Sequence, residues 1–309
     1  MSDKYNVSAS PHVRSKMTVQ TIMFLVIISL LPAAAFGIYR FGFNAALLIA
    51  VCIAACVLSE LLYTLLMKKK ATIGDFSAVL TGLLLALNLP PSAKWWMGII
   101  GSVFAIIVVK MLFGGLGQNF MNPALAGRCF LVICFTARMT DFSYDGVTGA
   151  TPLALIRDGV PVSLYDMFLG RISGTIGEVS TALLLAGAVF LIVMGIIDVR
   201  ISFSYLLSFV LFMGLFAGRG WDITYLAAQL CGGGLMLGAF FMATDYVTSP
   251  ITKTGRILFG ICCGLLTGLF RVFSSSAEGV SYAIIISNLL VPLLEKITMP
   301  KCFGKGGEI

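Results

Sequence analysis

The chain has 309 residues, of which 59% are hydrophobic and only 11% charged, with a mean hydropathy of +1.00. A soluble domain carries about a quarter charged residues, so this composition excludes a water-soluble globular protein. The net charge of +7 does not indicate nucleic-acid binding, because the only basic run, Lys68 to Lys70, follows an apolar stretch as membrane anchors do. The eight cysteines form no CxxC pair and His12 is the single histidine, which argues against zinc or a self-contained iron–sulfur centre. A cluster shared with another chain stays open.

Apolar runs between helix breakers predict about ten membrane helices, since a bilayer span needs about 20 mostly apolar residues. In chain order the predicted spans are 21–38, 43–67, 75–90, 94–113, 122–137, 177–197, 201–217, 223–243, 257–272 and 279–296. The first run lacks a cleavage site, so we expect a retained helix rather than a signal peptide. The predicted fold class is an all-α integral membrane protein with polar tails at 1–20 and 297–309 and one long loop at 138–176.

The positions of Lys and Arg predict which side of the membrane each loop faces. If the N-terminus is cytoplasmic, fourteen of the 21 basic residues fall on the cytoplasmic side, Lys110 and Arg128 among them. This excess predicts that both termini are cytoplasmic and that the loop at 138–176 faces outward.

Two similar stretches indicate an internal duplication. "NLPPS" ending at Ser92 and "GGLGQNFMNPA" ending at Ala124 are matched by "YVTSP" ending at Pro250 and "SSSAEG" ending at Gly279. Pro250 follows Pro91 by 159 residues, and Ser275 follows Gly115 by 160. Because five is odd, two five-helix units at 21–137 and 177–296 would form an inverted repeat. The alternative is that connections simply contain Gly, Ser and Pro.

The long loop contains the segment "DGVTGATP" at 145–152. Gly149 and Ala150 remove bulk before Thr151, and Pro152 restrains the backbone after it, so the threonine hydroxyl is displayed on an open turn. On composition alone, the competing interpretation is a polar turn in which Thr151 caps a short helix.

The same segment fits the flavinylation pattern Asp-x-x-(Ser/Thr)-Gly-Ala-(Thr/Ser), with Asp145, Thr148, Gly149, Ala150 and Thr151 at its positions. The wider chain resembles the family that contains the D subunit of the Rnf complex and the B subunit of the sodium-translocating NADH:quinone reductase. The likeness extends over nearly all the hydrophobic part and includes "GGLGQNFMNPALAGR", "MATDYVTSP" and "EGVSYAIIISN". The length favours the Rnf branch of this family. The family fold resembles that of urea-type channels, built from two inverted five-helix repeats.

The resemblance implies a cofactor, a reaction and partners. FMN would be joined to Thr151 through a phosphoester by a separate, metal-dependent flavin transferase, and a second, noncovalent flavin such as riboflavin would lie elsewhere. The chain would pass electrons in an ion-translocating ferredoxin:NAD oxidoreductase complex, coupled to sodium or proton transport. Its partners would include a second FMN-bearing subunit and iron–sulfur subunits in a bacterial or archaeal cell membrane. The chain alone carries no NAD fingerprint, no catalytic residue and no metal ligands that we can assign.

Five further polar residues are candidates for an ion or flavin pathway: Glu60, Asn119, Asn122, Asp245 and Glu278. Four of them have a structural alternative. Glu60 could be bonded to a neighbouring helix, the two asparagines could belong to a tight connection with Pro123 in the first turn of the next helix, and Glu278 could cap the last helix. Asp245 could contact a partner or a noncovalent flavin.

Two other functional classes compete with an electron carrier. Inverted repeats with broken helices are also typical of solute channels and secondary transporters. A purely structural membrane scaffold with an unmodified Thr151 is the third class. The "DGVTGAT" loop discriminates, because a transporter has no need for it.

Overall fold

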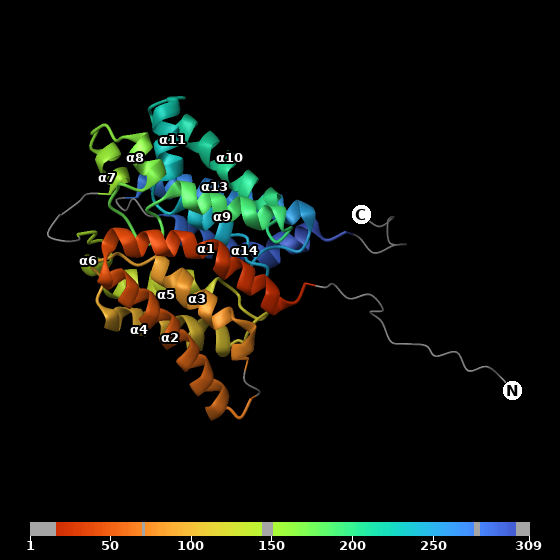
Figure 1. Ribbon diagram of the computed structural model, residues 1–309. Helices are drawn as coiled ribbons and strands as arrows, with labels where there is room; N and C mark the ends of the chain where they lie inside the picture. The colour runs from red at the N-terminus through yellow and green to blue at the C-terminus, as the bar shows by residue number, and fades with distance from the viewer. Residues whose placement is uncertain (1–16, 70–71, 144–150, 275–278, 301–309) are drawn as a thin grey trace, which may run out of the picture.

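The computed structural model describes residues 17–69, 72–143, 151–274 and 279–300, and within these ranges every regular element is a helix (Figure 1). Five helices of 18 to 24 residues are long and apolar enough to cross a membrane: α1 Val19–Phe41, α2 Phe43–Leu66, α10 Val199–Phe216, α13 Lys253–Phe273 and α14 Val280–Thr298. At 1.5 Å per residue they span about 27–36 Å, which matches the roughly 30 Å hydrocarbon core. The predicted all-α, multi-pass membrane class is confirmed.

The remaining apolar helices are short or broken. They are α3 Ser77–Leu87, α4 Trp95–Val103 continuing as η2 Phe104–Met111, α5 Pro123–Cys134, α9 Thr181–Val193, and α11 Ile223–Cys231 followed by α12 Leu235–Leu237 and η3 Gly238–Met242. The last set is bent by 65° at its break. A helix or a bent set of helices therefore lies at each of the ten predicted spans. Those that are too short to cross alone need the non-helical segments at their ends.

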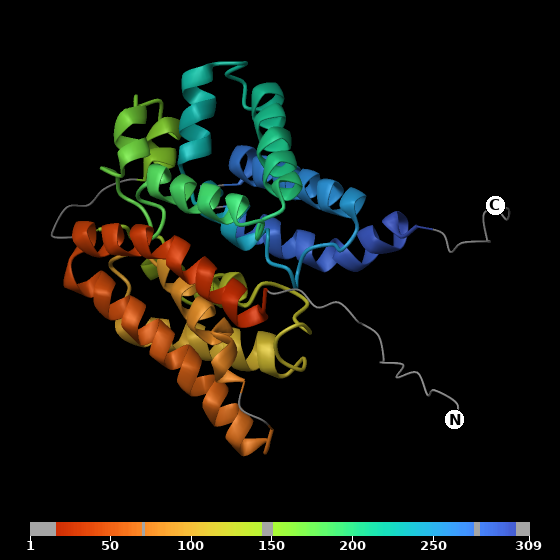
Figure 2. The same cartoon turned by 45° about the vertical axis from the view of Figure 1, so that its right-hand side comes forward.

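The bundle has two distinct ends (Figures 1 and 2). We call the end where α1 begins and α14 finishes the terminal end. The opposite end, the loop end, carries three short helices of the long loop: α6 Thr136–Met139, α7 Pro152–Arg157 and α8 Leu164–Leu169. A short turn of helix, η1 Ile73–Asp75, precedes α3. Asp75 accepts a hydrogen bond from the Ser77 N–H (2.8 Å) just before α3, although the N-cap position of α3 is held by Phe76.

One helix pairing recurs in the two predicted halves. The second helix contacts the fourth in each half, α2 with α4 and α10 with α13. Ser102 of α4 donates to Cys52 O of α2 (3.2 Å), and Tyr205 of α10 shares a hydrogen bond with Thr267 of α13 (2.7 Å). A duplicated unit would give this pairing, and the inverted repeat stays a prediction.

The α10–α13 contact depends on a row of glycines at every fourth position of α13, Gly260, Gly264 and Gly268. A Cβ atom on Gly264 would lie 1.9 Å from Ser208 Oγ and 2.5 Å from Tyr205 O. Small residues of this kind allow two helix backbones to approach closely within a membrane.

Helix α1 lies at the boundary between the halves, where it runs beside α9 (Figure 2). It packs on α2 and α3 of its own half and on α9 of the other. A Cβ on Gly187 of α9 would be 2.5 Å from Ser29 O of α1, so the two backbones touch. This helix joins the halves into one core.

Candidate functional site

The predicted flavin threonine lies at the loop end. Thr151 occupies the N-cap position of α7, and its carbonyl accepts the Leu155 N–H (3.0 Å). Its side chain makes no capping hydrogen bond. The predicted short helix is therefore present, but the hydroxyl is not used to cap it. Asp145, Thr148, Gly149 and Ala150 lie outside the described residues.

Thr151 lines a small cavity whose other walls come from two distant parts of the chain. These walls include Gly174 and Glu178 around the end of the long loop, and Gly232 and Gly233 at the break between α11 and α12. The cavity therefore connects the predicted flavin site to the interior of the second half.

Residues 174–180 enter the bundle before α9 begins, and we call them the inserted segment. The Ile176 N–H donates to Leu89 O (3.0 Å), and the Gly177 N–H donates to Leu87 O (2.8 Å), which ties the segment to the end of α3. Glu178 in this segment is buried. Sequence reasoning missed it, although it falls within the predicted span 177–197, where an ionisable residue is a signal of function.

A larger pocket lies at the terminal end, between the two halves. Its cavity volume is about 70 Å³. Its polar lining comes from Lys110, Asn119 and Asn122 of the first half and from Thr244 and Asp245 of the second. The structure thus brings three of the five predicted pathway residues together in one place.

The connection before α5 forms one wall of this terminal-end pocket. Pro123 is the first residue of α5, and the Asn122 side chain caps it by accepting from Ala124 N–H (3.1 Å) and Leu125 N–H (3.4 Å). Asn119 Oδ1 is buried and has no hydrogen-bond partner among the described residues. The connection is therefore capped as predicted, and it also lines a cavity.

The connection before α5 is also hydrogen-bonded to the second half. With its amide oriented to satisfy both neighbours, Asn288 accepts from the Asn122 N–H (3.2 Å) and donates to Thr248 O (3.1 Å). Arg128 of α5 donates to Ser281 Oγ of α14 (2.5 Å). These hydrogen bonds hold α5 and the connection before it against α14 of the second half.

Glu60 belongs to a buried polar network at the edge of the same pocket. Lys110 Nζ lies 2.6 Å from Glu60 Oε2 and 2.6 Å from Ser77 Oγ, and the Thr72 hydroxyl donates to Glu60 Oε1. The side chains of Glu60 and Lys110 are 0% and 1% exposed. The interpretation of Glu60 as bonded to a neighbouring helix is confirmed, and its role in ion passage stays a prediction.

The burial of Lys110 and Arg128 corrects the count of basic residues on the cytoplasmic side. Lys110 and Arg128 were placed among cytoplasmic loop charges, but both are buried in the bundle. Each is compensated by a polar partner on another helix, which local hydropathy does not reveal. Neither residue therefore contributes to the loop asymmetry that predicts orientation.

Asp245 lies in the connection after η3. Its carboxylate accepts from Val247 N–H (3.4 Å) and from the Thr248 hydroxyl (3.4 Å). Burial raises the pKa of Asp245, and these two hydrogen bonds offset part of the rise. The Asp245 carboxyl group therefore holds its proton more tightly than a free aspartic acid does. Glu278, the fifth predicted residue, lies outside the described residues.

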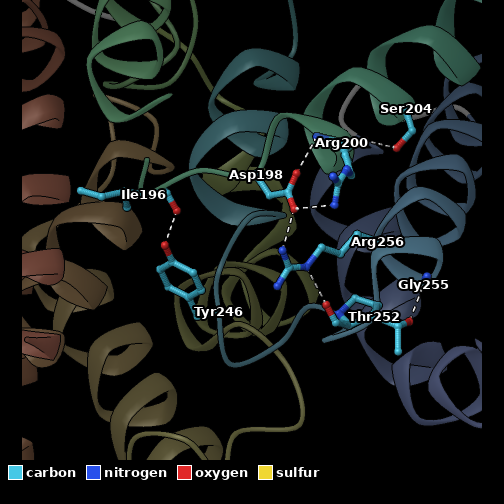
Figure 3. A network of polar contacts seen from close by, with 9 residues as sticks. Ile196, Asp198, Arg200, Ser204, Tyr246, Thr252, Gly255 and Arg256 are labelled. Carbon is cyan, nitrogen blue, oxygen red and sulfur yellow. Dashed lines mark hydrogen bonds and ion pairs between the residues drawn. The ribbon is translucent and has the colours of Figure 1, made fainter. Parts of the chain in front are cut away.

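A polar network next to the pocket links the start of α10 to the start of α13 (Figure 3). Arg256 lies 2.6 Å from Asp198 and donates from Nε to Pro250 O (3.0 Å), while the Tyr246 hydroxyl donates to Ile196 O. Burial alone would raise the pKa of Asp198, but hydrogen bonds from Arg200 N–H and Arg256 outweigh it and lower the pKa. Asp198 is therefore ionised at neutral pH. Its ion pair with Arg256 links the start of α10 to α13.

The apolar bundle, its broken helices and its polar pockets define a multi-pass membrane protein with functional groups placed inside the helix bundle. A model of the NQR2, RnfD, RnfE family matches residues 6–304, and the chain belongs to this family. The family predicted from the sequence motifs is confirmed.

Curated relatives match over almost their whole length. The D subunit of the Na(+)-translocating ferredoxin:NAD(+) oxidoreductase complex of Acetobacterium woodii is 47% identical over 307 residues, covering 96% of this chain and 95% of that protein. The D subunit of the proton-translocating ferredoxin:NAD(+) oxidoreductase complex of Clostridium ljungdahlii is 40% identical, covering 97% and 96%. The D subunit of an ion-translocating oxidoreductase complex of Escherichia coli is 33% identical, covering 97% and 98%.

Proposed function

We propose that this chain is the D subunit of an ion-translocating ferredoxin:NAD oxidoreductase complex and carries FMN through a phosphoester on Thr151. The observation that carries the proposal is a hydroxyl that fits the flavinylation pattern, makes no capping bond and lines a cavity at the loop end. The names of relatives at 47% and 40% identity support the assignment to the complex.

When bound, FMN supplies the capacity to accept and pass on electrons. The chain's own contribution is to anchor and place the group. The motif offers no histidine or other base beside Thr151, so the activating machinery for attachment belongs to a separate flavin transferase. The partners are the other subunits of the complex, including a second FMN-bearing subunit and iron–sulfur subunits, and the coupled ion is sodium or a proton.

The proposed orientation places both termini in the cytoplasm and Thr151 on the outer side. The remaining basic residues, led by the run at Lys68, support it. The separation of the terminal end from the loop end agrees with it, because α7, whose N-cap residue is Thr151, and the start of α1 lie at opposite ends of the bundle (Figure 1).

The terminal-end pocket is the proposed site of a second, noncovalent flavin. A flavin ring presents apolar faces and polar edges, and the pocket combines apolar walls with the Asn119 and Asn122 amides. Asn119 Oδ1 has no hydrogen-bond partner and is available to a ring N–H donor. These residues fit the group.

Replacing Thr151 with alanine is expected to abolish flavin fluorescence at the mass of this chain on a denaturing gel. The protein is produced in its native host, where the transferase is present. Thr140→Ala is the matched control, since Thr140 is also a loop-end threonine and its hydroxyl only donates to Thr136 O (2.9 Å). A band that stays bright in Thr151→Ala would place the flavin elsewhere. A wild-type mass without an FMN adduct would favour the channel or scaffold classes.

Replacing Asn119 with leucine is expected to remove most of the flavin that denaturation releases from the complex, while the covalent band at Thr151 persists. Leucine has a similar size but offers the pocket no hydrogen bond. The released flavin is measured by chromatography relative to protein. Phe120→Leu is the control, because Phe120 neighbours Asn119 but does not line the pocket. Unchanged flavin release in Asn119→Leu would contradict this site.

A further inference from the structure

An apolar groove lies on the exposed face of the α10–α13 pair and has a cavity volume of about 510 Å³. Large apolar side chains form its walls and are nonetheless exposed: Phe203 is 63% and Leu211 46% exposed on α10, and Leu265 is 43% exposed on α13. Contiguous exposed apolar surface marks a binding site, and the volume is within the range of ligand pockets. In a membrane, the occupant is either a lipid chain or another helix.

Beyond Arg200, the described residues that line the groove present no polar side chain that needs a partner. The two serine hydroxyls are bonded within α10, where Ser204 Oγ donates to Arg200 O (2.6 Å) and Ser208 Oγ donates to Tyr205 O (3.1 Å). The other walls are Phe, Leu and Ile side chains. Hydrocarbon alone therefore satisfies the length of the groove.

Helices α10 and α13 run parallel, so both begin at the same end of the groove. A Cβ on Gly260 would lie 2.0 Å from Ser204 Oγ, and a Cβ on Gly268 would lie 2.5 Å from the Phe212 ring. The two helices thus advance in step from one end of the groove to the other.

The groove begins at the terminal end of the bundle. The Thr252 and Thr298 hydroxyls share a hydrogen bond (2.6 Å), which places the start of α13 beside the end of α14. From Arg200 to Phe216 the groove follows α10 for about 24 Å at 1.5 Å per residue. One leaflet contributes about half of the roughly 30 Å hydrocarbon core, so the groove is long enough for a whole acyl chain from the leaflet at this end.

The mouth of the groove carries excess positive charge. Arg200 lines the groove, is 45% exposed, and lies 3.9 Å from Asp198, which is already paired with Arg256 at 2.6 Å (Figure 3). Lys253 precedes the lining residue Ile257 by one turn on the same face of α13. The Lys253 side chain is exposed and has no ion pair among the described residues. The mouth therefore has three basic side chains for one carboxylate.

This charge fits an anion. Glu295 of α14, another carboxylate at the terminal end, accepts from the Ile251 N–H (3.0 Å) and does not pair with Lys253. Because both helices begin here, the positive ends of their dipoles add to the charge. Basic sites between membrane helices on the cytoplasmic side bind anionic lipid headgroups. An apolar partner helix would fill the walls but would leave Arg200 and Lys253 without a counter-charge.

We propose that the groove binds an anionic phospholipid, with one acyl chain along α10 and α13 and the phosphate beside Arg200 and Lys253. The leaflet at the terminal end supplies this lipid, which is the cytoplasmic leaflet in the proposed orientation. The site does not depend on a flavin at Thr151 or on electron transfer.

The test uses the assembled complex from its native host in phosphatidylcholine bilayer discs that contain a phosphatidylglycerol probe with a photoreactive diazirine in one acyl chain. After illumination, the labelled peptides of this chain are mapped by mass spectrometry. The probe is expected to label the groove peptides of α10 and α13 more strongly than a phosphatidylcholine probe with the same chain. Arg200→Gln and Lys253→Gln should each lower this labelling roughly fivefold, the effect of one basic residue on anionic-lipid binding. Lys296→Gln is the control, since Lys296 is also exposed at the terminal end but does not line the groove.

The acyl chain is tested separately from the headgroup. Leu211→Trp narrows the groove and is expected to lower the labelling of α10 and α13. Leu289→Trp is the matched control, because Leu289 is 51% exposed on α14 and lies outside the groove, so its labelling pattern should stay as in wild type.

Several outcomes would overturn the site. Equal groove labelling by the two probes, or equal labelling in Arg200→Gln, Lys253→Gln and Lys296→Gln, would exclude recognition of the headgroup. A groove without label in the assembled complex, with label elsewhere on the chain, would assign it to a partner helix. If Leu211→Trp fails to assemble, Phe203→Ala decides, since it removes one exposed wall and should also weaken the labelling. A dark Thr151 band would defeat the proposed function alone, because the lipid labelling does not depend on flavin.

Discussion

Replacing Lys110 with methionine is expected to destabilise the protein by about 3–5 kcal/mol, because it leaves the Glu60 carboxylate buried without its cation. Lys110 also donates to Ser77, so the substitution loosens the start of α3. The expected result is a sharp fall in the yield of folded protein and in its melting temperature in detergent. Lys69→Met is the control, since Lys69 is solvent-exposed.

The double variant Glu60→Gln with Lys110→Met is expected to regain most of the lost stability, because both charges are then removed. It also separates the two roles considered for Glu60. If Glu60 only holds α2 against η2, the complex with the double variant transports ions at the wild-type rate. If Glu60 lies on the ion path, the complex is stable but transports little. A single Lys110→Met variant that melts like wild type would show that the pair does not stabilise this contact.

Replacing Gly264 with leucine is expected to separate α10 from α13. The first added carbon would lie 1.9 Å from Ser208 Oγ, and the neighbouring Tyr205 O is backbone and cannot rotate away. Overpacking of a tight core costs about 1–3 kcal/mol and more where backbone must move. The measurement is the melting temperature and the fraction of monodisperse protein after detergent extraction.

Leu265→Ala is the control for that experiment, because Leu265 lies on the same helix but is 43% exposed. A graded test is also available. Gly264→Ala should be destabilised less than the leucine variant, and Ser208→Gly should relieve only part of the loss because Tyr205 O stays in place. Equal stability of Gly264→Leu and wild type would contradict close packing of these helices.

The local sequence was sufficient to predict the helices and one wall of the terminal-end pocket. The long apolar runs predicted α1, α2, α10, α13 and α14, because the hydropathy signal lies within each run. Asn122 followed by Pro123 predicted the start of α5 for the same reason, since capping is a contact between near neighbours.

Other features depend on contacts between distant segments, which periodicity cannot reveal. Lys110 resembles a loop anchor until Glu60, fifty residues earlier, is placed beside it. Glu178 lies at the start of a predicted span, and its burial follows from backbone bonds between the inserted segment and Leu87 and Leu89. Asp245 and Asn119 line one pocket only because the two halves close around it. The motif at Thr151 was visible because it is contiguous.

The contact between α1 and α9 determines the order in which the chain can mature. Helix α1 is synthesised first, yet the backbone that fits against Ser29 belongs to Gly187, far later in the chain. A nascent chain that has inserted only its first five helices into the bilayer therefore has a flank of α1 that α9 does not yet cover. Final docking of the earliest helix waits for the ribosome to complete α9, so a fragment truncated before that point exposes this flank to lipid and to quality-control proteases.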